Sequence, residues 1–98
     1  MRIYPFTTAT FVAILPGFGL SAEGSIIFGG NFTSAPKVLV GDIDVTGGSA
    51  GELYRVQLVL YCCKVDNAIN SSCKARLLNT SPNAVNYTIT WNCVAIGN

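Results

Sequence analysis

The last extended segment of the chain limits its possible folds more than any other feature. One side of this segment has an apolar residue at every second position: Val85, Tyr87, Ile89, Trp91, Cys93 and Ala95. The other side begins with four polar residues: Asn86, Thr88, Thr90 and Asn92. Because successive side chains of a strand point to opposite faces of its sheet, this alternation predicts a half-buried antiparallel strand. Trp91 is therefore expected in the core and not as a platform for a ligand.

Shorter segments upstream also have the composition of strands. They are rich in apolar and β-branched residues, are separated by turns rich in Gly, Asn and Ser, and cover residues 25–28, 37–44, 53–63 and 73–78. No segment has the apolar period of an amphipathic helix. The chain of 98 residues has the length of one domain. The sequence thus predicts an all-β fold, a small antiparallel β-sandwich of about six strands.

The segment 53–63 has two faces of different character. One face is wholly apolar and is expected in the core: Val56, Leu58, Leu60 and Cys62. The other face mixes polar and apolar residues: Arg55, Gln57, Val59 and Tyr61. Half of the chain is hydrophobic and only 11% is charged, against roughly 25% charged residues in ordinary domains. Since so few charges leave neutral surface to be covered, we predict that the mixed face lies at a subunit interface.

Residues 1–24 have two possible interpretations. Arg2, an apolar middle and the small residues Ser21 and Ala22 imitate a secretory signal peptide. Pro16 and Gly17, however, interrupt the apolar run. The alternative is a retained, extended N-terminal arm that packs on a neighbouring subunit. In either case the β-sandwich is expected to cover residues 25–98.

The composition excludes most catalytic and nucleic-acid-binding functions. The chain has no histidine, the commonest general base and zinc ligand. Asp42 and Asp44 share one face of a strand and are expected to be solvated acids at its end. We therefore predict no enzyme, no metal site and no cofactor. The basic residues form no cluster for phosphates, and no apolar stretch of about 20 residues is present, so neither nucleic-acid binding nor a membrane span is expected.

The four cysteines leave two interpretations open. They occur at positions 62, 63, 73 and 93, without a C-x-x-C pair of the zinc-site type. Cys62 or Cys63 would form a disulfide with Cys73, and Cys93 would take the remaining partner. Alternatively, all four are buried thiols that pack as small hydrophobic side chains.

The order of several short motifs resembles the H-type lectin domain. The motifs are Ile27-Phe28, residues 32–40 (FTSAPKVLV), Ile43-Asp44, Arg55-Val56 and residues 87–97 (YTITWNCVAIG). The resemblance implies an antiparallel sandwich that forms a homotrimer and binds galactose-type sugars between neighbouring subunits. Members of this family occur in snail agglutinins and slime-mould discoidins, and similar sandwiches end phage tail and fibre proteins.

The resemblance also implies a set of carbohydrate-binding residues. Arg55 matches the Arg that opens the central strand of the family. Asn79, Thr80 and Asn83, in the loop before the last strand, would add polar contacts. The aromatic and His positions of the family fall near Asn79 and Thr80, so the ring that stacks on the sugar would come from Tyr54 or Tyr61.

A structural role for Arg55 is the alternative, in an ion pair with Asp42, Asp44 or Glu52. In that case Arg55 would hold a subunit interface together and would not bind a ligand.

These observations predict a non-enzymatic carbohydrate-binding or attachment module, homotrimeric, on a virion fibre or tail or in a secreted agglutinin. Its partners would be itself and a glycan or neighbouring virion proteins, and it would be virion-bound or extracellular. The alternative is a purely structural virion protein, a capsid decoration or tail component, with the same sandwich and no sugar binding.

Overall fold

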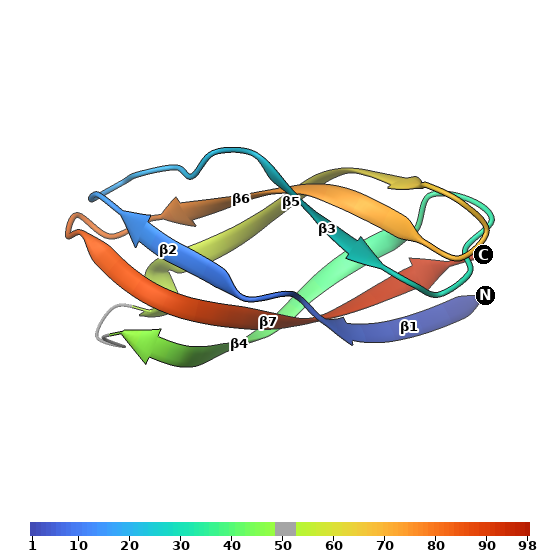
Figure 1. The fold of residues 1–98 in the computed structure, drawn as a ribbon, viewed down its shortest axis with the longest axis horizontal. Helices are drawn as coiled ribbons and strands as arrows, with labels where there is room; N and C mark the ends of the chain where they lie inside the picture. Colours follow the sequence, from blue (N-terminus) through green and yellow to red (C-terminus); the bar gives the residue numbers. More distant parts are fainter. Residues whose placement is uncertain (49–52) are drawn as a thin grey trace.

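The computed structural model describes residues 1–48 and 53–98 and consists of two antiparallel sheets packed against each other (Figure 1). Sheet A contains β1 (Arg2–Thr7), β2 (Phe11–Leu15), β4 (Lys37–Gly48) and β7 (Val85–Gly97). Sheet B contains β3 (Gly24–Phe28), β5 (Val56–Val65) and β6 (Ser71–Asn79), and the short 3-10 helix η1 (Leu53–Arg55) precedes β5. The small all-β sandwich expected from the sequence is confirmed. In the described ranges, no helix is long and apolar enough to cross a membrane.

Each sheet is built around one long central strand. In sheet B, β6 lies between β3 and β5. In sheet A, β4 pairs along one edge of β7, while β1 and β2 follow one another along the other edge. β1 pairs with residues 92–97 of β7, and β2 pairs with residues 85–89. β1 and β2 therefore occupy the place of a single edge strand with a break in its middle.

Residues 1–24 do not form the separate arm considered from the sequence. Both β1 and β2 are hydrogen-bonded members of sheet A, and Ala13 is 1% exposed. At the break between the two strands, the backbone N–H of Thr8 donates to the carbonyl of Trp91, and the N–H of Trp91 donates to Oγ1 of Thr8. The segment is held in place because it completes the free edge of β7 and adds apolar residues to the core.

The core lies between the two sheets and is centred on the inner face of β7. All the apolar residues of that face are buried: Val85, Tyr87, Ile89, Trp91, Cys93 and Ala95. Trp91 is 3% exposed, and the ring of Phe11 meets it edge-on at 5.8 Å between centroids. From sheet B, Leu58 and Leu77 pack against this layer. The prediction of Trp91 as a core residue is confirmed.

A β-bulge in β5 changes the expected faces of its cysteines. The backbone of Cys62 has a φ of 52°, and the register between β5 and β6 shifts between Tyr61 and Lys64. This extra residue turns Cys62 outward, where it is exposed, and turns Cys63 inward. The expectation that Cys62 shares the core face of Val56 and Leu58 is therefore wrong.

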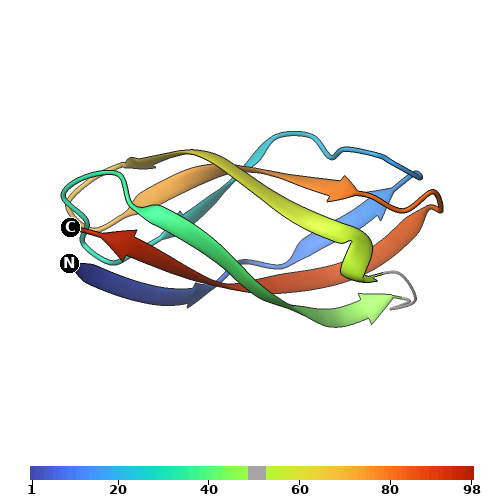
Figure 2. The ribbon, with the colours of Figure 1, turned by 180° about the vertical axis from the view of Figure 1, so that it is seen from behind.

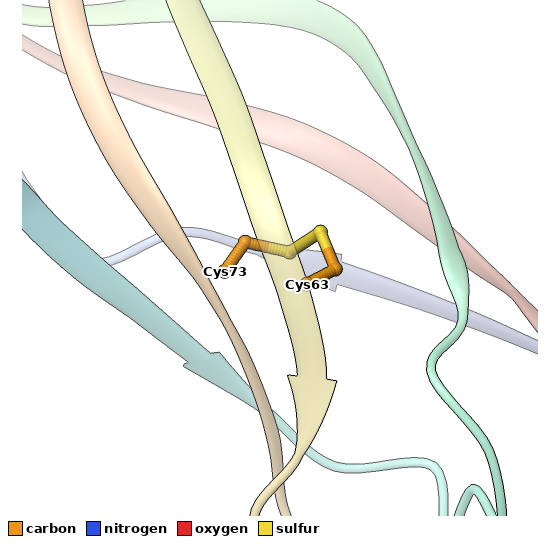
Figure 3. Close-up of a disulfide and its surroundings, with 2 residues drawn as sticks. All are labelled: Cys63 and Cys73. Atoms are coloured by element: carbon orange, nitrogen blue, oxygen red, sulfur yellow. A yellow bond between two sulfur atoms is a disulfide. The ribbon is translucent and has the colours of Figure 1, made fainter.

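Cys63 forms a disulfide with Cys73 on the neighbouring strand β6, and the two Cα atoms are 4.1 Å apart (Figure 3). Among the described residues, Cys62 and Cys93 are free thiols. The structure thus combines parts of both interpretations of the cysteines. It has the disulfide to Cys73 that the first interpretation expected, and it keeps Cys93 as a buried thiol, as the second expected.

Loss of this disulfide is expected to destabilise the domain by about 2.5–3 kcal/mol, the entropy of closing a loop of this size in the unfolded chain. Urea unfolding of the double variant Cys63→Ala/Cys73→Ala measures this loss. Cys62→Ala is the matched control and should leave the midpoint unchanged, since its side chain is exposed and unbonded. Peptide mapping that finds Cys62 in a disulfide would contradict the assignment.

The sheet edges are irregular, which limits pairing with other chains. The edge formed by β1 and β2 is broken at residues 8–10, and bulges interrupt β4 and β5. At the bulge in β4, a Cβ on Gly41 would lie 2.6 Å from the carbonyl oxygen of Asn92, so only glycine fits there. Bulges and breaks of this kind are the usual protection of edge strands against edge-to-edge association. Contacts between copies of the chain are therefore expected on the sheet faces and not at these edges.

Candidate functional site

The two ends of the elongated sandwich differ in what they expose. Both termini lie at one end (Figures 1 and 2). The opposite end, called the distal end below, is formed by residues 16–20 after β2, by η1 and by residues 80–84 between β6 and β7. All four residues that the sequence suggested for carbohydrate binding lie at the distal end.

Asn79 connects the loops of the distal end from a fully buried position. Its side chain is 0% exposed. Its Nδ2 donates to the carbonyl of Pro16 at 2.9 Å and to that of Asn83 at 2.8 Å, and its Oδ1 accepts from the N–H of Ser81 at 2.9 Å. Because every polar atom of the amide is used inside the protein, Asn79 is a structural residue. Contact of Asn79 with a ligand would require these loops to open, and it stays a prediction.

The loop after β2 fits closely against the loop before β7. A Cβ on Gly17 would collide with the carbonyl of Pro82, so only glycine allows this approach. The next residue, Phe18, has a φ of 57°, and its N–H donates to the carbonyl of Ser81 at 2.9 Å. The Phe18 side chain is 68% exposed. Phe18 was not among the predicted site residues, although the preceding Pro16-Gly17 pair is a turn signal that places the next residue in a loop.

Arg55 and Thr80 are held together through the backbone. The N–H and the Oγ1 of Thr80 both donate to the carbonyl of Arg55, at 2.9 and 2.7 Å. These bonds fix η1 against the loop before β7 and use the Thr80 hydroxyl as a donor. Arg55 and Thr80, which the resemblance assigned to one binding site, are therefore neighbours, and their contact is part of the framework.

Tyr54 is the exposed residue of this cluster, and Arg55 beside it is half-buried. Tyr54 is 74% exposed. The guanidinium carbon of Arg55 is 5.4 Å from the centroid of the Tyr54 ring, and Nε donates to the Tyr54 hydroxyl at 3.1 Å. A cation beside an aromatic ring stabilises the orientation of both side chains. With the exposed residue Asn83 on the loop before β7, the distal end presents an aromatic ring, a guanidinium and a polar loop to solvent.

The carboxylates of Asp42 and Asp44 lie elsewhere and do not pair with Arg55. Both accept from Nδ2 of Asn92 at 3.0 Å, in the middle of the outer face of sheet A. Oδ1 of Asn92 in turn accepts from Oγ1 of Thr7 at 2.7 Å. Glu52, the third acid considered as a partner of Arg55, lies outside the described residues.

The predicted interface residues Gln57, Val59 and Tyr61 lie on the outer face of sheet B. Tyr61 takes part in a polar network there. Its hydroxyl donates to Oε2 of Glu23 at 2.6 Å and accepts from Nε of Arg76 at 3.0 Å. The hydrogen bond from Tyr61 lowers the pKa of Glu23, and the charge of Lys74, whose Nζ lies 3.5 Å from Oε1 of Glu23, acts in the same direction. This network fixes the connection between β2 and β3 to the face of sheet B.

The free thiols have no arrangement that suggests nucleophilic chemistry. Burial raises the pKa of Cys93, which disfavours the reactive thiolate. Cys62 is exposed, and the chain has no histidine to act as its base. Within the described part of the chain, no group of three His, Cys, Asp or Glu side chains is placed to hold a metal ion.

The fold is a small all-β sandwich, and its distal end exposes Tyr54 and Asn83. No protein-family model, no curated protein and no solved structure matches the chain. The resemblance to the H-type lectin domain therefore stays a prediction, and the function has to be inferred from the surface itself.

Proposed function

We propose that the chain is a non-enzymatic binding module that holds a carbohydrate against Tyr54 at the distal end. The observation that carries this proposal is the pairing of a 74% exposed tyrosine ring with the guanidinium of Arg55. The C–H face of a hexose packs against an aromatic ring, and its hydroxyls accept hydrogen bonds from a guanidinium, which offers several donors in fixed geometry. Asn83 and the backbone of the loop before β7 would supply the remaining polar contacts.

The proposed site supports weak binding of a single sugar. Tyr54 offers one exposed ring face, and the pairing of Arg55 with Tyr54 limits how far the guanidinium can turn toward a ligand. We expect a dissociation constant on the order of 1 mM for a monosaccharide. Useful attachment would then require several copies of the chain acting together.

Tyr54→Ala is expected to reduce binding to a galactose and N-acetylgalactosamine glycan array at least about tenfold, which is about 1.4 kcal/mol. The matched variant Tyr54→Phe keeps the ring and should keep most of the binding. Arg55→Gln removes the guanidinium and should weaken binding while the protein stays folded. The proposal is wrong if the unmutated protein binds no glycan on the array, or if Tyr54→Ala binds as well as the unmutated protein does.

A purely structural role in a virion, such as capsid decoration or a tail component, is the second candidate function. It is favoured by the outer face of sheet A, where Ile3, Val12, Ile14 and Leu39 are each about 60% exposed or more. Apolar side chains in such numbers call for a covering surface. For both functions we propose an extracellular or virion location, which the Cys63–Cys73 disulfide supports because such bonds persist in oxidising compartments. The homotrimer, with Gln57, Val59 and Tyr61 at its interface, remains a prediction from the resemblance.

A further inference from the structure

The outer face of sheet A carries an apolar patch in the half nearest the termini. The register of the sheet arranges this half in three parallel rows across β1, β7 and β4. The first row is Ile3, Ile96 and Lys37, the second is Pro5, Val94 and Leu39, and the third is Thr7, Asn92 and Asp42, whose carboxylate accepts from Asn92. Asp44 pairs with Thr90 in the next row and also accepts from Asn92. We call Ile3, Pro5, Leu39, Val94 and Ile96 the apolar patch. Ile3 is 63% exposed and Leu39 is 59% exposed, Pro5 is also exposed, and Val94 and Ile96 between them are half-buried.

Opposite charges lie at the two ends of this patch, on the same edge strand. Lys37 stands in the first row, Asp42 stands in the third, and Asp44, which pairs with Thr90, stands in the row after it. Among the described residues, the salt bridges are Lys64–Asp66 and Lys74–Glu23, so none of the three charges at the patch has an ionic partner there. Successive rows are spaced by two residues, about 7 Å along the strands. The second row is therefore midway between Lys37 and Asp42.

We propose that the apolar patch binds a second copy of this chain, with a twofold axis running along the row of Pro5, Val94 and Leu39. This axis lies in the plane between the two sheet faces and runs perpendicular to the strands. It therefore reverses the strand direction, and each strand lies opposite the same strand of the other copy. Lys37 of one copy then lies over Asp42 of the other, with Asp44 one row farther along, and the second rows pack against each other. The interface uses the same surface on both copies, as twofold contacts do.

The outer face of sheet B is a poorer surface for the same purpose. Its charged residues are already paired within the chain, through Glu23, Lys74 and the contact of Arg76 with Tyr61. Covering that face would bury satisfied charges with little gain. The patch on sheet A instead combines exposed apolar side chains with charges that a second copy can complete.

The dimer would be weak and elongated. Only the halves of the molecules near the termini overlap, so the contact is smaller than the roughly 800 Å² per partner of a standard interface. We expect a dissociation constant of about 10–100 μM. The two distal ends point in opposite directions, so a dimer of the proposed carbohydrate-binding module would bridge two ligand-bearing surfaces. This last consequence depends on the proposed function, whereas the dimer itself does not.

A charge exchange tests the geometry by sedimentation velocity, without any glycan. The unmutated protein should be dimeric at about 1 mM, and Leu39→Glu should be monomeric. Lys37→Glu and the double variant Asp42→Lys/Asp44→Lys should each be largely monomeric alone, because each places like charges opposite one another. An equal mixture of these two variants should recover the dimer, since both contacts become complementary again.

Ile14→Glu is the matched control, because Ile14 is 67% exposed on the same face but outside the patch. This variant should keep the dimer. Circular dichroism shows whether each variant is folded. If the double variant Asp42→Lys/Asp44→Lys does not fold, Leu39→Glu still tests the patch. A protein that stays monomeric at about 1 mM overturns the proposal. A trimer that Leu39→Glu leaves intact also overturns the proposal and would favour the outer face of sheet B as the interface. A mixture of the two charge variants that fails to associate overturns it as well.

Discussion

Trp91→Ala is expected to reduce the free energy of unfolding by about 3–5 kcal/mol. The side chain is 3% exposed in the middle of the central strand of sheet A and meets the ring of Phe11 edge-on. Removing the indole leaves a cavity between the sheets that neighbouring strands cannot fill without breaking their pairing. Domains of this kind have total stabilities of about 5–15 kcal/mol, so the loss is a large part of the whole. Urea unfolding followed by far-ultraviolet circular dichroism measures it, since Trp91 is the sole tryptophan of the chain.

Trp91→Phe is the matched variant and should lose clearly less stability, because it keeps an aromatic ring in the core. In conditions where the Trp91 variants are fully folded, their glycan binding should equal that of the unmutated protein, because Trp91 lies on the inner face of β7. A Trp91→Ala protein with unchanged stability and lost glycan binding would mean that Trp91 belongs to a binding site and that the core assignment is wrong.

The sequence predicted those parts of the fold that follow from strict alternation. Residues 85–96 of β7 have one uninterrupted apolar face, and each residue of this face is buried as expected. The period of two determines which side chains face inward once a strand is regular. The central strand of sheet A and its core tryptophan could therefore be predicted from the sequence alone.

The predictions for the cysteine faces of β5 and for residues 1–24 differ from the structure because the backbone is irregular in both places. The bulge at Cys62 adds one residue to β5 and exchanges the faces of Cys62 and Cys63, which no alternation pattern can indicate. Residues 1–24 contain Pro16 and Gly17 after a short apolar run, and the same letters fit a signal peptide, an arm or an edge strand. Only the free edge of β7, a property of the assembled sheet, decides that β1 and β2 complete sheet A.

The sequence predicted where the residues of the candidate site lie better than it predicted what each of them does. Arg55, Thr80 and Asn83 do lie together at the distal end, as the motif order implied. Sequence cannot show burial of a polar side chain in a loop, because Asn is equally common at exposed turns and in buried hydrogen-bonded positions. Asn79 was therefore grouped with the exposed residues, and Phe18 was not considered.

Asn79→Ala is expected to destabilise the domain by about 3 kcal/mol. The substitution leaves the carbonyls of Pro16 and Asn83 and the N–H of Ser81 without their partner. Each buried polar group that loses its hydrogen bond costs about 1–3 kcal/mol, less where water enters the space. Asn79→Asp should be at least as damaging at neutral pH, because its carboxylate would face the two carbonyl oxygens that now accept from Nδ2. Urea unfolding measures both variants.

Asn86→Ala is the matched control, since Asn86 is exposed on the outer face of β7, and it should change stability by less than about 0.5 kcal/mol. The structural role of Asn79 also has a consequence for binding. In conditions where Asn79→Ala is fully folded, its glycan binding should equal that of the unmutated protein, whereas Tyr54→Ala should bind less even when folded. If Asn79→Ala keeps full stability and loses glycan binding, Asn79 contacts the ligand, and the loops of the distal end must open to admit it.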